Sequence, residues 1–337
     1  MTLLDVNELS IEYRTDEQTI HAVNDVSFTL QEGEILCIVG ESGCGKTTLA
    51  EALVGLLPSN GVVSGGNIML DETDLAQLSE SEYKDFRATE ISYVIQSAMN
   101  ALDPVYPIKK QFIEVIRTHT DLSKGEALER SEQMLENVGI DANRINDYPH
   151  ELSGGQRQRV VIAFSLLLEP SIVVADEPTT GLDVVVQDDV LEMILDLQRS
   201  LNNSMIIITH DMSVVAEIAD RVIVMYGGEI AEIGPVSEIF NHSAHPYTMG
   251  LNNAFPTLEV DVDQLISIPG SPPELLSEPS ECQFMERCPF STDECYTRPP
   301  LDTVDGTADH RAKCHYVEDR REFRDRAAHA ETWEPEQ

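Results

Sequence analysis

Lysine is scarce in this chain of 337 residues, where it occupies only positions 46, 84, 109, 110, 124 and 313. Lys and Arg together number 22 against 60 Asp and Glu, which gives a formal net charge of -38. Because tight electrostatic binding of DNA or RNA needs clustered Lys and Arg, the composition argues against a nucleic-acid partner. Such an acidic surface is tolerated best where salt screens the repulsion between carboxylates. We therefore expect a halophilic protein, and an ordinary acidic protein is the alternative.

The chain also lacks a hydrophobic run long enough to cross a membrane. Its longest apolar stretch, residues 160–168, has about half of the length that a transmembrane helix needs. The N-terminus has no basic segment followed by an apolar core, so that no signal peptide is expected. We therefore expect a protein of the cytoplasm that associates with membranes only through partners.

Hydrophobic residues make up 42% of the chain, too many for a disordered acidic protein. Apolar runs alternate with segments of helical spacing, which predicts an α/β fold whose sheet has parallel strands. We expect strands at residues 26–30, 35–39, 172–176 and 205–209, and helices at residues 46–57, 124–138, 153–168 and 185–201. Pro and Cys become frequent after Pro235, so that we expect a domain boundary near that residue.

A glycine-rich segment, Gly-Glu-Ser-Gly-Cys-Gly-Lys-Thr-Thr at residues 40–48, matches G-x-x-x-x-G-K-[ST] between a predicted strand and a predicted helix. The N–H groups of such a loop converge on phosphate oxygens at a helix N-terminus. Lys46 can reach the β- and γ-phosphates, and the Thr47 hydroxyl can bind Mg²⁺. The predicted nucleotide-binding residues are Gly40, Glu41, Ser42, Gly43, Cys44, Gly45, Lys46, Thr47 and Thr48.

Two carboxylates follow one another at the end of the predicted strand 172–176. In ATPases with a phosphate loop, such an Asp supports Mg²⁺ beside the phosphates, which makes Asp176 the candidate metal ligand. Glu177 is the candidate general base, because it can accept a proton from an attacking water at the exit of the strand. Two acids at a strand end are usually a solvated turn, but the phosphate loop upstream favours the functional interpretation.

A third motif, Leu-Ser-Gly-Gly-Gln at residues 152–156, precedes that strand. Ser153, Gly154 and Gly155 at a helix start offer N–H groups and a hydroxyl to a second anion, although alone they would be only an N-cap. With these three motifs in order, the chain resembles the nucleotide-binding subunits of ABC transporters. The resemblance implies that residues 153–156, including Gln156, face the γ-phosphate of ATP bound to a partner subunit, so that two domains enclose two ATP molecules.

Four further positions match the same family. Gln96 corresponds to the loop glutamine that senses Mg²⁺ and water and couples to the membrane subunits. His210 corresponds to the switch histidine at the γ-phosphate, and Asp183 to a loop that communicates across the dimer. Tyr13 stands where the family has an aromatic residue that stacks on adenine, although an aromatic residue in a first strand is commonly part of the core.

The C-terminal part is similar to the extension of ATPases from oligopeptide and dipeptide importers, here of haloarchaeal type. The resemblance is carried by His-Pro-Tyr-Thr at residues 245–248, Ile-Pro-Gly-Ser-Pro-Pro at residues 268–273, and the cysteines that follow. It implies a nucleotide-binding domain at residues 1–235, with a helical subdomain at about 97–165, and an extension at residues 236–337. It also implies ATP-driven peptide import from the cytoplasmic face of the membrane. The implied partners are two permease subunits, an extracellular substrate-binding protein and a second ATPase subunit, either a similar chain or a second copy.

The extension contains four cysteines at 282, 288, 295 and 314, and a cytoplasmic location disfavours disulfides. The resemblance implies that Cys282, Cys288, Cys295 and Cys314 hold a [4Fe-4S] cluster, consistent with four-cysteine ligation. Their spacing lacks the paired C-x₂-C of zinc ribbons. Zn²⁺ at the same thiols, and thiols that are unligated or joined in disulfides, stay open as alternatives.

Two other functions remain to be distinguished. Relatives with this extension also carry nickel or oligosaccharides, and no residue of this subunit decides the cargo. A soluble ABC ATPase without membrane partners, acting in iron-sulfur assembly, translation or DNA repair, is the second alternative. The C-terminal extension, the single set of ATPase motifs and the absence of sustained heptads argue against the soluble class.

Overall fold

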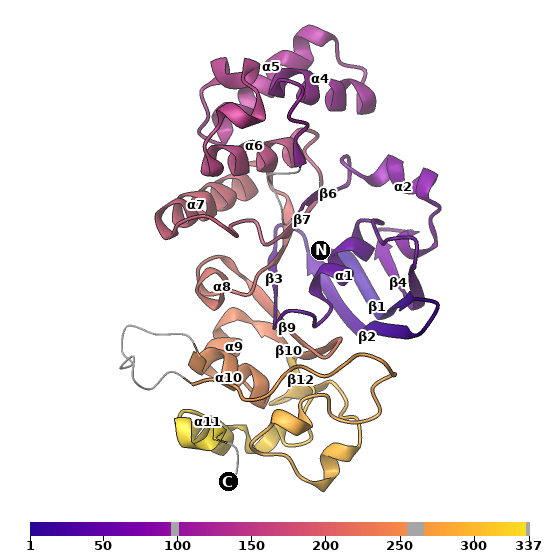
Figure 1. The fold of residues 1–337 in the computed structure, drawn as a ribbon, viewed down its shortest axis with the longest axis vertical. Coiled ribbons are helices and arrows are strands. Elements are labelled where there is room, and N and C mark those ends of the chain that lie inside the picture. Colours follow the sequence, from indigo (N-terminus) through magenta and orange to yellow (C-terminus); the bar gives the residue numbers. More distant parts are fainter. Residues whose placement is uncertain (96–100, 255–265, 335–337) are drawn as a thin grey trace. The chain divides into compact units, whose positions relative to one another are not determined.

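The computed structural model describes residues 1–95, 101–254 and 266–334 (Figure 1). The chain divides into two compact units, each assembled from separate segments. The first unit comprises residues 1–2, 30–35 and 78–208, and the second comprises residues 3–29, 36–77 and 209–337. Among the described residues, no helix is both long and apolar enough to cross a bilayer.

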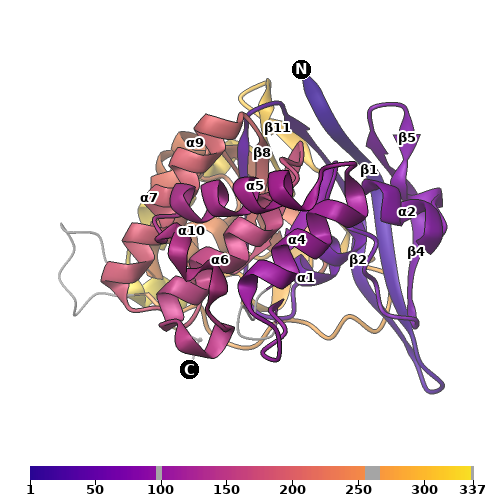
Figure 2. The ribbon, with the colours of Figure 1, turned by 90° about the horizontal axis from the view of Figure 1, so that it is seen from above.

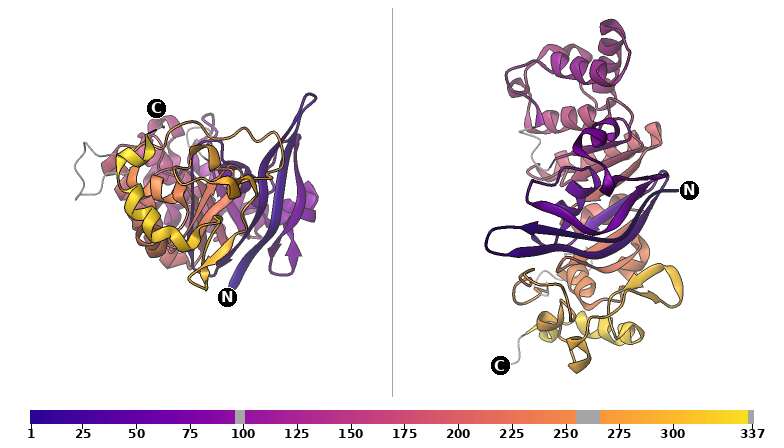
Figure 3. Two further views of the ribbon diagram at one scale, coloured as in Figure 1. Left: turned by 90° about the horizontal axis from the view of Figure 1, so that it is seen from below. Right: turned by 90° about the vertical axis from the view of Figure 1, so that its right-hand side faces the viewer.

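The second unit begins with an antiparallel sheet of order β2-β1-β4-β5, in which the two long N-terminal strands lie side by side (Figures 2 and 3). Its strands are β1 (Thr2–Arg14), β2 (Thr19–Gln31), β4 (Gly61–Leu70) and β5 (Thr73–Asp74). The glycines of β4 weaken its strand pattern, so that the sequence did not indicate this strand. A Cβ on Gly66 would lie 2.3 Å from the carbonyl oxygen of Asn7, so the close approach of β4 to β1 requires glycine here.

The second unit also contains a run of five strands in the order β11-β12-β10-β9-β3. The strands are β3 (Ile35–Val39), β9 (Arg221–Tyr226), β10 (Glu229–Pro235), β11 (Asp302–Val304) and β12 (Thr307–Ala312). β3 is buried along its length and parallel to β9, whereas β9, β10, β12 and β11 pair antiparallel. The extension therefore adds two strands to the edge at β10 instead of forming a sheet of its own.

The helices of the second unit are short. They are α1 (Lys46–Leu53), α8 (Met212–Ile218), α9 (Val236–Asn241), α10 (Pro246–Ala254) and α11 (Arg320–Ala327). Helices α10 and α11 pack against each other (Figure 1). Short 3-10 turns connect the remainder, namely η1 (Leu75–Gln77), η5 (Met285–Arg287), η6 (Asp293–Tyr296), η7 (Val317–Asp319) and η8 (Ala330–Trp333).

The first unit contains three parallel strands in the order β8-β7-β6 and helices that, apart from α2, are longer than those of the second unit. The strands are β6 (Ile91–Val94), β7 (Ile172–Asp176) and β8 (Ser204–Ile208). The helices are α2 (Glu80–Phe86), α4 (Ile108–His119), α5 (Lys124–Asn137), α6 (Gly154–Leu166) and α7 (Val184–Leu201), with 3-10 turns η2 (Ala142–Asn146) and η3 (Pro149–Glu151). The rings of Phe112 and Phe164, 5.5 Å apart, join α4 to α6.

The predicted α/β class is confirmed, and the strands at 35–39 and 172–176 have their predicted bounds. The strand expected at 26–30 is part of the longer β2, and the one expected at 205–209 lies one residue earlier as β8. The helix expected at 46–57 ends at Leu53, because Gly55 adopts a positive φ of 62° and Pro58 follows. The sequence pattern thus indicated the type of these elements more accurately than their ends.

Candidate functional site

The phosphate loop connects β3 to α1 in the second unit, and three of its glycines have positive φ values. A Cβ on Gly40 would lie 2.2 Å from the carbonyl oxygen of Met225, and one on Gly45 would lie 2.4 Å from that of Ala22. Larger residues would therefore open the loop. Helix α1 begins at Lys46 without a side-chain cap, so that its first N–H groups can bind an anion.

Lys46 points back into the loop that precedes it. Its Nζ donates hydrogen bonds to the carbonyl oxygens of Gly40 at 2.8 Å and Glu41 at 2.9 Å. The side chain is buried, with 8% of its surface exposed. The ammonium group thus lies inside the loop, where phosphate oxygens could replace its carbonyl partners. The residues present fit a bound triphosphate.

Tyr13 lies beside the first turn of α1. Its hydroxyl donates a hydrogen bond to Oγ1 of Thr48 at 3.0 Å. The pKa of Tyr13 is raised, mainly because burial disfavours the phenolate. Tyr13 and Thr48 are 35 positions apart in the sequence. The fold therefore brings Tyr13 of β1 next to the phosphate loop. Cys44, inside the loop, is buried as well, and burial raises the pKa of its thiol.

His210 belongs to the same unit as the loop. It follows Thr209, whose N–H donates to the carbonyl oxygen of Ile38 at 3.1 Å. Ile38 lies in β3, two residues before Gly40. The residue directly before His210 is therefore hydrogen bonded next to the start of the phosphate loop.

The two carboxylates are in the first unit. Asp176 ends β7 with 1% of its surface exposed, and its Oδ2 accepts a hydrogen bond from the Tyr93 hydroxyl at 3.3 Å. Glu177 has a φ of 49°, which is uncommon for a residue other than glycine. Its N–H donates to the carbonyl oxygen of Ile208, and its Oε2 accepts from the Thr180 hydroxyl at 2.7 Å. Both backbone and carboxylate of Glu177 are thus held in place.

The third motif forms the start of α6, also in the first unit. Ser153 and Gln156 form a capping box, in which each side chain accepts a hydrogen bond from the N–H of the other residue. Arg144 also donates to Oε1 of Gln156 at 2.8 Å. Gly154 borders open space, whereas a Cβ on Gly155 would lie 2.6 Å from Cγ1 of Val186. The helix start is therefore open at Gly154 and tightly packed at Gly155.

Asp183 caps α7, and its Oδ1 accepts from the N–H of Val186 at 3.1 Å. Gln96 lies outside the described residues. The predicted ATP-site residues accordingly fall into two groups, one per unit. The phosphate loop, Tyr13 and His210 form the group of the second unit, whereas Asp176, Glu177, Asp183 and residues 153–156 form that of the first.

The four cysteines of the extension line one small pocket in the second unit. Burial raises the pKa of Cys282 to about 11 and that of Cys314 to about 12, and neighbouring thiols add to both shifts. His245 also lines this pocket, and burial lowers its pKa to about 3. Among the described residues, no group of three or more His, Cys, Asp or Glu side chains is arranged to hold a single metal ion.

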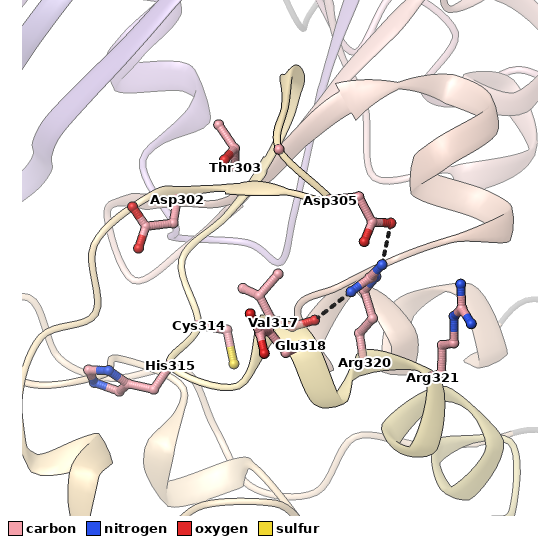
Figure 4. A pocket seen from close by; sticks show the side chains of 10 residues that line it. Asp302, Thr303, Asp305, Cys314, His315, Val317, Glu318, Arg320 and Arg321 are labelled. Atoms are coloured by element: carbon pink, nitrogen blue, oxygen red, sulfur yellow. Dashed lines mark hydrogen bonds and ion pairs between the residues drawn. The ribbon is translucent and has the colours of Figure 1, made fainter.

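Cys314 also lines a wider pocket, which the sequence did not indicate (Figure 4). Asp302, Thr303, His315 and Glu318 are among the residues that line it. Arg320 also lines it and donates hydrogen bonds to the Asp305 carboxylate and, at 3.0 Å, to the carbonyl oxygen of Val317. Cys314 and His315 line both this pocket and the four-cysteine pocket.

Comparison with known proteins identifies the family. A sequence profile described as "ABC transporter" matches residues 23–180, and one described as "Oligopeptide/dipeptide transporter, C-terminal region" matches residues 231–295. The oligopeptide transport ATP-binding protein OppD of Salmonella typhimurium is 44% identical over 302 residues, which cover 89% of this chain and 90% of OppD. The chain belongs to the ATP-binding subunits of ABC transporters of the oligopeptide/dipeptide type.

Other comparisons agree with this membership. The dipeptide transport ATP-binding protein DppD of Bacillus subtilis is 42% identical over 322 residues, 95% of this chain and 96% of DppD. A solved ABC cassette dimer in a post-hydrolysis state with ADP and Pi has a TM-score of 0.62 and 26% identity, covering 69% of this chain and 98% of that one. The protein is therefore an ABC ATPase, with the α/β fold predicted from its sequence.

Proposed function

We propose that this ABC ATPase binds MgATP between paired ATPase domains and uses its hydrolysis to drive the import of dipeptides or oligopeptides through a membrane permease. The observation that carries this proposal is the match of the C-terminal region, residues 231–295, to the family of oligopeptide/dipeptide transporters. Similarity to OppD and DppD over about nine-tenths of the chain supports it. Nickel and oligosaccharides remain the alternative cargoes.

The proposed ATP site uses the residues that the sequence motifs identify. Lys46 and the N-terminus of α1 bind the phosphates, while Asp176, Thr47 and Gln96 hold Mg²⁺, which neutralises phosphate charge when bound. Glu177 accepts the proton of the attacking water, and His210 contacts the γ-phosphate. Catalysis in this proposal rests on positioning and charge neutralisation, since phosphoryl transfer leaves little covalent chemistry to the protein.

The proposed assembly contains two permease subunits and a second ATPase subunit on the cytoplasmic face of the membrane. Ser153, Gly154, Gly155 and Gln156 of each ATPase then complete the nucleotide site of the other, and Asp183 lies at the same interface. A similar chain or a second copy of this one can fill the second position. An extracellular substrate-binding protein delivers the cargo.

Isolation of the tagged chain from native membranes at high salt tests the assembly. Mass spectrometry should detect two multi-span proteins and an ATPase subunit, and the purified assembly should hydrolyse ATP faster when its binding protein carries a peptide. Stimulation by nickel or an oligosaccharide instead of a peptide would identify that compound as the cargo. An active ATPase recovered without any membrane protein would favour the soluble class and contradict the import function.

We further propose that Cys282, Cys288, Cys295 and Cys314 hold a [4Fe-4S] cluster. All four cysteines line one small pocket, and ligation by four cysteines is typical of such a cluster. When bound, the cluster would cross-link a proline-rich segment that builds little core of its own.

Iron and sulfide analysis of anaerobically purified chain tests the cluster. We expect about four of each per chain, the iron number of this cluster type, with brown absorbance that Cys288→Ser abolishes. Cys37→Ser is the matched control, since Cys37 is a buried thiol of β3, and it should keep the iron. Stoichiometric zinc would select the zinc alternative, and a metal-free chain would remove both.

We also propose that the acidic composition adapts the protein to a salt-rich cytoplasm. The basis is the formal net charge of -38 in a chain with 22 basic residues. At low ionic strength, repulsion among the carboxylates opposes the compact state, and salt screens it.

A further inference from the structure

Glu41, the second residue of the phosphate loop, is fixed by residues far away in the sequence. Its N–H donates a hydrogen bond to the Tyr247 hydroxyl oxygen at 2.9 Å. Its carboxylate accepts two hydrogen bonds from Arg287, from Nη1 at 2.7 Å and from Nη2 at 2.9 Å. Both partners belong to the part of the chain that follows β10. The extension therefore contacts the phosphate loop directly, within one compact unit.

Arg287 is itself held rigidly. It ends the turn η5, and its Nε donates to the carbonyl oxygen of Pro269 at 2.7 Å. Nη1 also donates to the Tyr226 hydroxyl at 3.1 Å, and the guanidinium carbon lies 5.6 Å from the Tyr226 ring centre and 5.9 Å from that of Phe284. Arg287 is 8% exposed. A buried guanidinium in such a setting forms a bidentate pair of fixed geometry that Lys cannot reproduce.

The charges of this contact affect how the loop binds phosphate. The loop binds a polyanion, and the Glu41 carboxylate would add a negative charge beside it that repels phosphate. Arg287 compensates this charge at contact distance. Lys46 at the same time donates to the carbonyl oxygen of Glu41, so that the backbone, the carbonyl and the carboxylate of one loop residue are all engaged.

We propose that Arg287 is a positioning residue of the ATP site, which acts through Glu41 to hold the phosphate loop in its binding conformation and to cancel the negative charge of that loop. The four-cysteine segment thereby becomes part of the nucleotide site, because Arg287 lies between Cys282 and Cys288. This role adds to the residues of the ATPase motifs, none of which lies beyond His210.

Calorimetric titration of MgATP into the full chain tests this role, with Glu177→Gln as the parent to prevent hydrolysis. Arg287→Met should raise the Kd for MgATP about tenfold or more, because it leaves the Glu41 charge uncompensated. Arg287→Lys keeps the charge without the bidentate geometry, so its Kd should lie between those of the parent and of Arg287→Met. In the hydrolytically active chain, Arg287→Met should raise KM while kcat stays within about threefold.

A double variant that lacks both the Arg287 guanidinium and the Glu41 carboxylate distinguishes an effect on the phosphate loop from a general structural role. Adding Glu41→Gln to Arg287→Met removes the repelling charge and should recover part of the lost affinity, while the loss that comes from the missing bidentate contact remains. Glu41→Gln alone breaks the same contact and should raise the Kd for MgATP, but less than Arg287→Met does, which keeps the test usable if Arg287→Met fails to fold.

Arg298→Met is the matched control. Arg298 forms a comparable pair in the same extension, with Nε 2.6 Å from the Glu229 carboxylate, and neither residue is in the phosphate loop. Unchanged affinity in Arg287→Met, equal weakening in Arg298→Met, or no recovery of affinity when Glu41→Gln is added to Arg287→Met would overturn the proposal. Loss of bound iron in Arg287→Met together with weak binding would also overturn it, since the residue would then support the extension only. Neither the cargo nor the permease enters this measurement, so its failure is distinct from a failure of the proposed function.

Discussion

At the scale of single residues, Glu177 shows how the backbone prepares a side chain for chemistry. The chain leaves β7 through a residue with a φ of 49°, a conformation that costs free energy for a residue with a side chain. The Thr180 hydroxyl then orients the carboxylate through a hydrogen bond of 2.7 Å. Such a fixed carboxylate at a strand exit suits a general base, which must meet its water in one geometry.

Glu177→Gln should therefore bind MgATP within about threefold of the wild type but lose at least about 100-fold in kcat, since general-base catalysis contributes factors of that order. Thr180→Val should cost less, because it removes only the orienting hydrogen bond. Steady-state hydrolysis and equilibrium binding on the same preparations measure both effects. Retained hydrolysis in Glu177→Gln would show that another group activates the water.

At the scale of elements, three helices begin with the same device. Capping boxes start α2 at Ser79, α5 at Ser123 and α6 at Ser153. In the first two boxes the partner is a Glu whose pKa is lowered, mainly by the hydrogen bond from the serine hydroxyl. In α6 the partner is Gln156, so that this helix start carries no carboxylate to repel an anion. The difference supports the proposal that the α6 start faces a phosphate.

Ser153→Ala and Ser123→Ala form a matched pair for this point. Each should lower the free energy of unfolding by about 1 kcal/mol, because each removes an N-cap hydrogen bond. Only Ser153→Ala should also slow ATP hydrolysis in the assembled transporter. Chemical denaturation and ATPase assays measure the two effects separately. Equal ATPase rates in both variants would show that Ser153 acts only as a helix cap.

At the scale of the whole molecule, the excess of acidic residues dominates. Since the formal net charge is -38, unfolding relieves carboxylate repulsion at low ionic strength. At about 1 M salt the screening length falls to about 3 Å, and most of this repulsion disappears.

The Tm should therefore rise with KCl, by about 10 °C between about 0.2 M and about 3 M, which corresponds to about 7 kcal/mol for a chain of this size. Differential scanning calorimetry measures the shift. KCl is the suitable salt, because sulfate strengthens apolar burial in any protein. A Tm that stays constant or falls would contradict salt adaptation and support the alternative of an ordinary acidic protein.

Features that depend on residues close together in the chain could be predicted from the sequence, whereas features that depend on distant residues could not. The phosphate loop was recognisable because strand, turn and helix start are contiguous in residues 35–53, and each residue type has a local physical reason there. The carboxylates at 176 and 177 were recognisable for the same reason. The strand β4 was missed, since its glycines weaken the local pattern and only the close approach to β1 explains them.

By itself, the sequence determined the α/β class, the ATPase motifs and the cluster of cysteines, because these depend on local propensity and on residue types that carry a chemistry. Tertiary structure alone decided which distant residues touch the loop. Glu41 and Arg287 are 246 positions apart, and β12 joins β10 across more than seventy residues. No periodicity or spacing encodes such contacts, since they arise only when burial of the whole chain brings the two segments together.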